Sequence, residues 1–474
     1  MKPGAIACLV LLGALPGCAV GPDYKRPQVQ ITSAYKEAGE WKPAQPQDDL
    51  DRGKWWGVFG DPQLDVFLQQ VEISNQNVLV ADAQFRRAQA LVASSRAAYF
   101  PTLDAGVSVV RSRSPTGVIG GTTAGRIITN RSASLNSGWE ADLWGRLRRT
   151  VESSEAGAQA SAADLAAARL SAQAEVASDY FQLRILDAQR QLLEDTVAGY
   201  QKSLDLTRNR YDAGVAAKVD LVQAETQLKS TQAEAIDTGV QRAQLEHAIA
   251  VLIGKAPAEF SIAAAPLAAA MPRVPMGLPS ELLERRPDVA AAERRVAAAN
   301  AQIGVAKAAY FPSLILSASY GSRSADASQW FTVPSRFWSI GPALAQSIFD
   351  AGLRRAQTEQ AIAAYDATVA EYRQAVLAGF QEVEDNLAAL RILGEEAEVQ
   401  EGAVRAARES VLLTTNQYKA GIVSYINVVT VQTTQLNNER TAVGILGRRL
   451  VAAVILVKAL GGGWGAAEIA ADNR

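Results

Sequence analysis

The sequence predicts a mainly α-helical fold with a small β part, in which one architectural unit is used twice. Three observations lead to this prediction. A set of short motifs recurs about 210 residues later in the same order, two long stretches contain no proline, and two intervals alternate apolar and polar residues. Together they indicate two similar halves, each with long helices and a few strands.

Three pairs of motifs carry the internal repeat. They are AAYFPTL at 97–103 with AAYFPSL at 308–314, LWGRLR at 143–148 with AGLRR at 351–355, and RYDAGV at 210–215 with QYKAGI at 417–422. Markers that return in the same order indicate a duplication. We therefore predict a first repeat at 62–256 and a second at 287–461, joined by a proline-rich connector at 257–286.

The N-terminus has the pattern of an export signal. Lys2 precedes an apolar segment, and Leu15-Pro16-Gly17-Cys18 resembles the lipobox of bacterial lipoproteins. This resemblance implies a signal peptide at 1–17 and a covalent lipid on Cys18; an ordinary secretory signal with a chance cysteine is the alternative. The polar, proline-containing segment 18–61 predicts an extended arm that lies on the body.

Proline placement predicts the long helices. No proline occurs between Pro115 and Pro257 or after Pro342, and proline breaks helix interiors. We predict one helix at 145–211 and its repeat at 352–418, each reaching ~100 Å at 1.5 Å per residue. That length is about three times the bilayer core, but the residues are too polar for lipid, so these helices stand in an aqueous space.

The ends and faces of these helices are also predictable. Apolar residues in the second copy recur every three or four positions, which is typical of side-by-side helix packing; they are Tyr365, Val369, Tyr372, Val376, Phe380, Val383, Leu387 and Leu390. Gly214 and Gly421 end the long helices, because glycine accepts a positive φ. Return helices to about Ile253 and Leu460 would complete two antiparallel hairpins, followed by a loose tail at 462–474.

Each repeat also contains a β-like interval, at 103–143 and 313–348, between a single short helix at the start of the repeat and the long helix. Leu135 and Trp139 alternate with Ser134 and Asn136, and strands of about 10 residues with one apolar face are typical of transmembrane β-barrels. Aromatic residues flank these intervals and predict two interfacial girdles: Tyr99, Phe100, Trp144, Tyr310 and Phe311 at one end, with Trp330, Phe331, Phe337 and Trp338 at the other. A soluble hairpin with aromatic contacts is the alternative.

The number of strands predicts an oligomer. Four strands cannot close a barrel, and an open strand edge is not viable in lipid. Barrels start at about eight strands, so two chains are the minimum and three would give twelve.

The composition argues against an enzyme. The chain has one histidine and two cysteines, and Cys8 would leave with the signal peptide. Metal clusters of His and Cys and histidine-based triads are therefore excluded, and no phosphate-binding glycine loop is present. The formal net charge of −2 gives no indication of nucleic-acid binding. We predict no cofactor, no metal and no catalytic residue.

The turns at the hairpin tips are the candidate site. Their polar residues would ring the end of a tube if the hairpins of several chains converge, and ion pairs there would hold it shut. The gate candidates are Asp212, Lys218, Asp220, Lys419, Tyr425 and Asn427. The alternative is that these turns are polar because they are wet.

Four segments resemble a known family. WWGVFGDPQL at 55–64, ERRPDVAAAE at 284–293 and the two Tyr-Phe-Pro motifs resemble the outer-membrane factor (TolC-like) family, in its NodT-type lipoprotein branch. This resemblance implies a homotrimer with a twelve-stranded outer-membrane barrel on a periplasmic helical tunnel. It also implies a periplasmic adaptor, an inner-membrane pump of the resistance-nodulation-division type, and small-molecule export through a gated duct.

The resemblance also bears on the gate. Asp220 matches an acidic tip position of the family, whereas Asn427 and Thr430 stand where some relatives carry aspartates. Two alternative functions remain open: an exit duct for type I secretion or metal efflux, and a lipid-tethered periplasmic coiled-coil adaptor or scaffold. An adaptor needs only one hairpin and would not duplicate the amphipathic strands.

Overall fold

The structure is a computed structural model that describes residues 19–29, 34–38, 54–113, 127–267 and 285–462. The predicted lipidation site Cys18, the signal peptide, most of the connector and the C-terminal tail lie outside the described residues. The described residues form two compact units, and each unit contains segments from both repeats. The first unit holds 85–161 and 292–372 with residues 19–28 of the arm, and the second holds the remainder.

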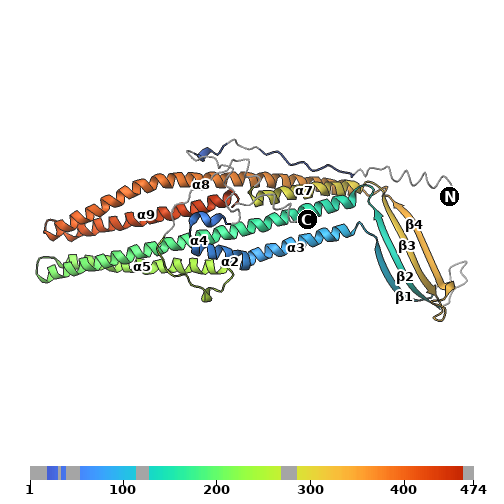
Figure 1. The fold of residues 1–474 in the computed structure, drawn as a ribbon, viewed down its shortest axis with the longest axis horizontal. Helices are drawn as coiled ribbons and strands as arrows, with labels where there is room; N and C mark the ends of the chain where they lie inside the picture. Colours follow the sequence, from blue (N-terminus) through green and yellow to red (C-terminus); the bar gives the residue numbers. More distant parts are fainter. Residues whose placement is uncertain (1–18, 30–33, 39–53, 114–126, 268–284, 463–474) are drawn as a thin grey trace. The chain divides into compact units, whose positions relative to one another are not determined.

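A four-stranded antiparallel sheet belongs to the first unit (Figure 1). Its strands, in spatial as well as sequence order, are β1 (Thr102–Arg113), β2 (Ile127–Ala141), β3 (Ser313–Ser324) and β4 (Arg336–Ala345). The two repeats therefore meet at the β2–β3 pairing, where Leu135 lies opposite Tyr320 and Trp139 opposite Leu316. The outer strands β1 and β4 each have one edge that pairs with no other described strand of the chain.

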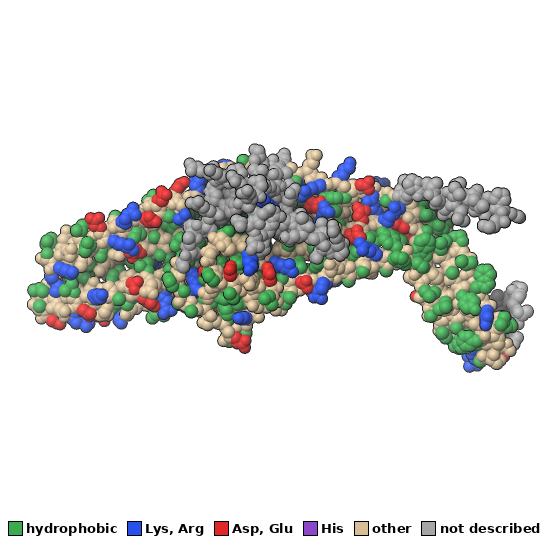
Figure 2. All heavy atoms as spheres, in the orientation of Figure 1, with side chains coloured by type: hydrophobic (Ala, Val, Ile, Leu, Met, Phe, Trp, Pro, Cys, Tyr) green, Lys and Arg blue, Asp and Glu red, His purple; other side chains and the backbone are tan. Residues whose placement is uncertain are grey.

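The pairing register divides the sheet into an apolar and a polar face. Residues that are paired across strands share a face, and successive residues alternate between faces. The apolar face carries Leu103, Val107, Leu135, Trp139, Leu316, Tyr320, Trp338, Ile340 and Leu344. Its side chains are open to solvent in the single chain, with Val107 73% exposed and Ile340 76% exposed. Figure 2 shows hydrophobic side chains over much of the visible side of the strands.

The polar face carries hydroxyl, amide and carboxylate groups. Its members are Thr102, Asp104, Ser108, Ser132, Ser134, Asn136, Ser317, Ser319 and Ser339. The hydroxyls of Ser319 and Ser339 lie 2.9 Å apart across the β3–β4 pair. The alternation of Leu135 and Trp139 with Ser134 and Asn136 places these residues on opposite faces, as the sequence predicts.

Helices connect to the same end of every strand. α3 (Gln76–Ala97) leads into β1 and α7 (Pro287–Ala308) leads into β3, each through a Tyr-Phe-Pro motif. α4 (Arg146–Asp212) follows β2, and α8 (Leu353–Lys419) follows β4. The end of α3 is attached to α4 by polar contacts: the Ser95 and Ser154 hydroxyls lie 2.8 Å apart, and Arg96 pairs with Glu155 at 2.5 Å.

The second unit contains two helical hairpins (Figure 1). The remainder of α4 turns back into α5 (Lys218–Leu252), and the remainder of α8 turns back into α9 (Tyr425–Ala459). α4 and α8 have 67 residues each, and α5 and α9 have 35 each, the equal lengths expected of a duplicated unit. Along α8, Tyr372, Val376, Val383 and Leu387 of the predicted apolar series are fully buried.

Short helical turns replace part of the extended arm that we predicted for 18–61. Residues Trp55–Phe59 form the 3-10 helix η2, because Trp55, Trp56 and Phe59 bury their rings; Phe59 lies 4.9 Å from the ring of Phe181 on α4. Asp61 then begins α2 (Pro62–Ser74) by accepting hydrogen bonds from the amides of Gln63 and Leu64. Shorter 3-10 turns are η1 (Lys36–Ala38), η3 (Pro257–Glu259) and η4 (Val333–Ser335).

Two helices replace the single helix expected at the start of the first repeat. The helical conformation is interrupted between α2 and α3 at Asn75, whose side-chain oxygen accepts a 3.1 Å hydrogen bond from the amide of Val78. The amide group of Asn75 donates to the carbonyl of Leu252, at the end of α5, at 2.6 Å. The break therefore fixes α2 to the end of the first hairpin.

Candidate functional site

The two hairpin turns have the same backbone geometry. Gly214 has φ +75° and Gly421 has φ +76°. The amide of Val215 donates to the carbonyl of Arg210, and the amide of Ile422 donates to that of Gln417, both at 2.9 Å. This hydrogen-bond pattern is a Schellman motif, in which glycine at the left-handed position ends the helix. The predicted tip glycines thus lie where each long helix ends.

A buried cluster joins the two hairpins close to these turns. It is formed by residues of α4, α5, α8 and α9: Tyr200, Leu204, Ala224, Leu228, Tyr418, Tyr425 and Val428. The rings of Tyr418 and Tyr425 meet edge to face with centroids 5.3 Å apart. Burial, together with the neighbouring Tyr418, raises the pKa of Tyr425 to about 12. Tyr425 therefore belongs to the packed interior of the tip as a neutral phenol.

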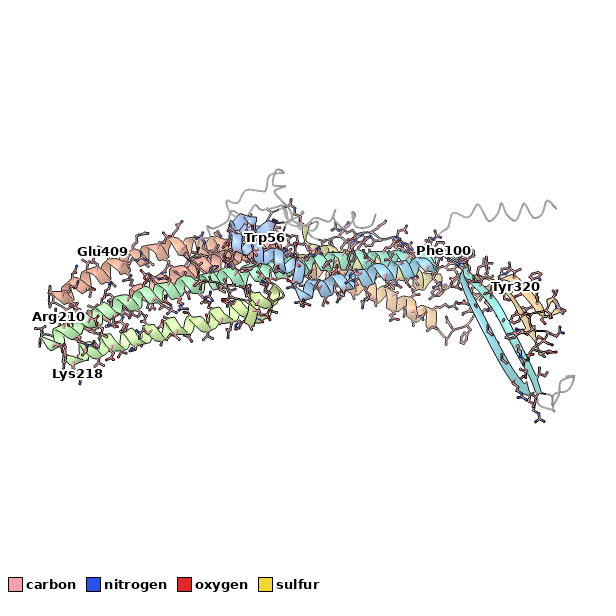
Figure 3. All side chains as sticks on the ribbon, turned by 60° about the horizontal axis from the view of Figure 1, so that its bottom comes forward. Trp56, Phe100, Arg210, Lys218, Tyr320 and Glu409 are labelled. Carbon is pink, nitrogen blue, oxygen red and sulfur yellow. The ribbon has the colours of Figure 1, made fainter. Side chains whose placement is uncertain are left out.

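Arg210 links the first turn to the second. Its Nη1 donates a 3.0 Å hydrogen bond to the backbone carbonyl of Lys419, and its guanidinium lies 4.9 Å from the centre of the Tyr418 ring. The hydroxyl of Thr207 lies 3.4 Å from that of Tyr418. Figure 3 shows Arg210 and Lys218 at the end of the hairpin formed by α4 and α5. The tip is thus held by a cation, an aromatic ring and a carbonyl.

The other gate candidates lie around this link. Asp212 and Lys218 are exposed, and Asp220 is half-buried in the first turn of α5. Lys419 contributes its carbonyl to Arg210, and the side-chain amide of Asn427 donates to the Ser424 hydroxyl at 3.1 Å. Sequence reasoning missed Arg210 and Thr207. The repeat itself carried a signal, because Gln417 replaces Arg210 at the matching position of the second copy.

The predicted aromatic residues lie at both ends of the sheet. At the helix end, Trp144 stacks on Phe311 with centroids 4.7 Å apart and donates from Nε1 to the carbonyl of Pro312 at 2.8 Å. Trp139 donates from Nε1 to the carbonyl of Tyr99 at 2.8 Å, and Phe100 and Tyr310 are exposed. Figure 3 shows Phe100 at this junction and Tyr320 on the sheet.

At the loop end, the predicted aromatic residues divide among three positions. Trp330 and Phe331 stack with centroids 4.8 Å apart in the segment between β3 and β4. Trp338 lies on the apolar face of β4, opposite Tyr320. Phe337 lies on the polar face, under the guanidinium of Arg323 at 5.1 Å, so it does not share the face of the other strand aromatics.

A groove of about 1150 Å³ lies between the hairpins of the second unit. It is lined mainly by amide, aliphatic and charged side chains, among them Asp179, Gln182, Ile185, Gln241, Glu396 and Arg448. Burial, together with the nearby Glu175, raises the pKa of Asp179 to about 6. At one side Gly447 approaches Ile185 so closely that an added Cβ would lie 2.8 Å from Cγ1.

The N-terminal arm is held against the first unit by polar contacts. The amide of Val20 donates to the carbonyl of Trp144 at 3.0 Å, and Asp23 pairs with Arg149 at 2.8 Å. Asn300 donates to the carbonyl of Pro22 at 2.9 Å, and the hydroxyl of Tyr24 donates to Glu293. The first described residue, Ala19, lies directly against Gly145 at the start of α4.

Two structural features are absent from the described part of the chain. No group of three or more His, Cys, Asp or Glu residues there is arranged to hold a metal ion. None of the described helices combines the length and the apolar character needed to cross a membrane.

Comparison with known proteins decides the family. The model of the family described as outer membrane efflux protein matches residues 67–255 and 278–462. The chain belongs to the outer membrane efflux protein family. This result confirms the predicted family, and it makes the chain a transport component of the outer membrane and not an enzyme.

Individual members of the family are similar over nearly their whole length. The chain is 31% identical to a probable efflux pump outer membrane protein, TtgC of Pseudomonas putida, over 467 residues that cover 98% of this chain and 96% of that protein. It is also 31% identical to the pyoverdine export outer membrane protein OpmQ of Pseudomonas aeruginosa, over 97% of this chain and 96% of that one.

Solved structures of family members have the same fold. The outer-membrane channel OprN superposes with a TM-score of 0.86 at 31% identity, over 94% of this chain and 100% of that chain. The open state of the MtrE outer membrane channel of Neisseria gonorrhoeae superposes with a TM-score of 0.83 at 28% identity, over 94% and 98%. These likenesses confirm the predicted combination of long helices and a small sheet.

Proposed function

We propose that the protein is the outer-membrane exit duct of a tripartite efflux pump. One observation carries the proposal: a four-stranded sheet with an exposed apolar face and a polar face continues into two 67-residue helices. Lipid accepts the apolar face, whereas the helices are suited to water. The relatives named for efflux support the same function.

The strand edges support a homotrimer. In the part of a single chain that the structure describes, β1 and β4 each leave one row of backbone donors and acceptors unpaired, and such a row is costly in lipid. Pairing β1 of one copy with β4 of the next satisfies both rows. Three copies would give a twelve-stranded barrel, which lies within the known range of barrel sizes.

The two faces of the sheet support a water-filled duct. With the apolar face toward lipid, the serine, threonine and asparagine side chains of the polar face would line the interior. A hydroxyl-lined passage suits the export of small molecules. One relative in Pseudomonas putida is named as a toluene efflux pump outer membrane protein and OpmQ as a pyoverdine export outer membrane protein, and both compounds are small molecules.

The hairpin tips support both a gate and a partner site. The contact of Arg210 with Lys419 holds the two turns of one chain together, which favours a closed end. The turns also expose apolar side chains, with Val215 64% and Ile422 72% exposed. We infer that a periplasmic adaptor binds these residues and connects the duct to an inner-membrane pump of the resistance-nodulation-division type, which supplies the energy.

The arm supports a lipid anchor on Cys18. The amide of Val20 donates to the carbonyl of Trp144, which lies where the strands join the helices. Trp144 stacks there on Phe311, and both residues belong to the predicted interfacial aromatic girdle. An acyl chain on Cys18, two residues before Val20, would enter the leaflet at this level. The anchor and the barrel would then sit at the same membrane surface.

The decisive experiment measures the mass of the purified protein in detergent together with its single-channel conductance in a planar bilayer. A trimer with a small, rarely open conductance is expected. A monomer that stays soluble without detergent and does not conduct would refute the duct and favour a lipid-tethered helical scaffold.

A further inference from the structure

Four arginines occupy the loop end of the apolar face of the sheet. Arg336 lies in the same cross-strand row as Ala133 and Val107, and Arg131 lies in the row of Val109. Arg111 and Arg113 extend the same face of β1 by two further rows. We call these four residues the arginine row.

The charged residues that the four strands place on the apolar face are all basic. The acidic residues of the four strands, Asp104 and Glu140, both lie on the polar face. At the helix end, the apolar face finishes in Ala141, Leu314 and Leu344, which are paired across β2, β3 and β4. Its net charge is therefore positive, and all of that charge is at the loop end.

The side chains of the arginine row lie at the surface of the sheet. Arg111, Arg113 and Arg336 are exposed, and Arg131 is half-buried with its Nη1 donating to the carbonyl of Ala325 at 2.7 Å. That hydrogen bond directs one guanidinium toward the segment beyond β3. Figure 2 shows basic side chains toward the loop end of the sheet, beyond the hydrophobic ones.

The position of the row along the strands matches a membrane surface. From Ala141 to Arg131 the strand advances ten residues, or ~33 Å at 3.3 Å per residue. Strands tilted by about 40° in a barrel reduce this to about 25 Å along the membrane normal, the height of the apolar band of such barrels. Trp338 and Tyr320 lie in the neighbouring cross-strand row, on the helix side of Arg336. Tryptophan and tyrosine in membrane proteins lie at the headgroup level.

We propose that the arginine row binds the phosphate groups of phosphorylated glycolipid in the outer leaflet of the membrane. The inference rests on the proposed function, because the apolar face contacts lipid only if the sheet is part of a barrel. Guanidinium groups bind phosphate in a bidentate manner, and their aliphatic stems lie along the apolar strand surface. The adjoining aromatic side chains cover the upper acyl chains.

The helix end of the apolar face carries no basic residue in the described strands. The arginine row would therefore also determine which end of the barrel lies in the outer leaflet. Phosphate binding at the loop end and the lipid anchor at the helix end would hold the barrel at a fixed depth. Basic residues at an anionic lipid surface each strengthen binding about fivefold. Removing three of them is therefore expected to weaken binding about 100-fold.

The test measures retention of bisphosphorylated lipid A by the full-length protein in detergent, by native mass spectrometry. The variant carries Arg111→Gln, Arg131→Gln and Arg336→Gln together, and the matched control is Arg323→Gln, at the same end of the sheet but on the polar face. We expect about 100-fold weaker retention in the triple variant. The control and the parent protein should bind alike, and dephosphorylated lipid A should bind as weakly to the parent as intact lipid A binds to the triple variant.

Three results would overturn the inference: undiminished retention by the triple variant, equal retention of dephosphorylated lipid A, or displacement of lipid A by millimolar inorganic phosphate. The oligomer mass and conductance of every variant are measured in parallel, and Arg336→Gln alone replaces the triple variant if that variant does not assemble. A conducting trimer that retains lipid A equally with and without the three arginines refutes the inference but not the proposed duct. A soluble, non-conducting monomer refutes both.

Discussion

The guanidinium of Arg210, at the end of α4, donates a 3.0 Å hydrogen bond to the backbone carbonyl of Lys419, at the end of α8. The same guanidinium lies over the ring of Tyr418. One side chain therefore holds together the two turns that would close the periplasmic end of the proposed duct. Because a charge-assisted hydrogen bond and a cation–π contact act together, the link contributes about 2–3 kcal/mol.

Arg210→Ala is expected to increase the open probability of the channel by about 30-fold to 140-fold, since each 1.4 kcal/mol changes an equilibrium tenfold. Single-channel recording of the purified protein in a planar bilayer measures the effect. Arg208→Ala is the control, because Arg208 is an exposed arginine on the same turn of α4. Equal open probabilities in the two variants would mean that Arg210 does not help to keep the channel closed.

A buried ion-pair network should determine the stability of the second unit. The side chain of Asp187 on α4 is only 3% exposed, and it accepts hydrogen bonds from Arg184 at 2.9 Å and from Arg242 of α5 at 2.7 Å. Asp187→Ala leaves buried guanidinium charge uncompensated and is expected to cost about 3–5 kcal/mol. Denaturant unfolding followed by helical circular dichroism measures this loss. Asp195→Ala, at an exposed carboxylate of the same helix, should stay within about 0.5 kcal/mol of the parent.

The sequence predicted the large elements well because their signals are local. Proline breaks helix interiors, so its absence between Pro115 and Pro257 and after Pro342 allowed two long helices. Their predicted bounds, 145–211 and 352–418, lie within one residue of the observed ends. Alternation along β2 assigned Leu135 and Ser134 to opposite faces without knowledge of the partner strands. Glycine at 214 and 421 marked the turns because only that residue accepts the left-handed conformation at little cost.

Features that depend on tertiary packing were not predictable in this way. The 3-10 turn at Trp55–Phe59 forms because its rings pack against α4, where Phe181 lies 122 residues beyond Phe59 in the sequence. The composition of the segment alone suggested an extended arm. At the tip, the charges of Asp212 and Lys218 made these residues gate candidates. The link instead uses Arg210 and a backbone carbonyl, and a carbonyl has no sequence signature.

The carboxyl group of Asp179, in the groove between the hairpins, should titrate at about pH 6. Asp179 has a pKa of about 6, raised by burial and by Glu175 from an unfolded value near 3.8. The folded chain therefore binds a proton more tightly than the unfolded chain does. The resulting stabilisation is complete below about pH 4 and is lost as the pH rises to about 6.

Asp179→Asn keeps the site neutral at every pH. The variant should match the parent at about pH 4 and be more stable than the parent at about pH 7.5, as judged from denaturant midpoints. Asp205→Asn, at an exposed carboxylate further along α4, should reproduce the pH profile of the parent. A parent profile that is flat between these pH values would contradict the burial of a protonated Asp179.

The orientation of the sheet in the membrane is tested by adjacent residues of β4. Ile340 lies on the apolar face in a row with Ala318, Ser137 and Leu103, and Ser339 lies next to it on the polar face. A charged residue in the middle of the lipid-facing band of a barrel costs about 2–4 kcal/mol, whereas the aqueous interior accepts it at little cost. Ile340→Arg is therefore expected to reduce assembly in lipid vesicles strongly, and Ser339→Arg is expected to assemble normally with an altered conductance. The opposite ranking would mean that the polar face contacts lipid, and equal assembly of both variants would mean that neither face does.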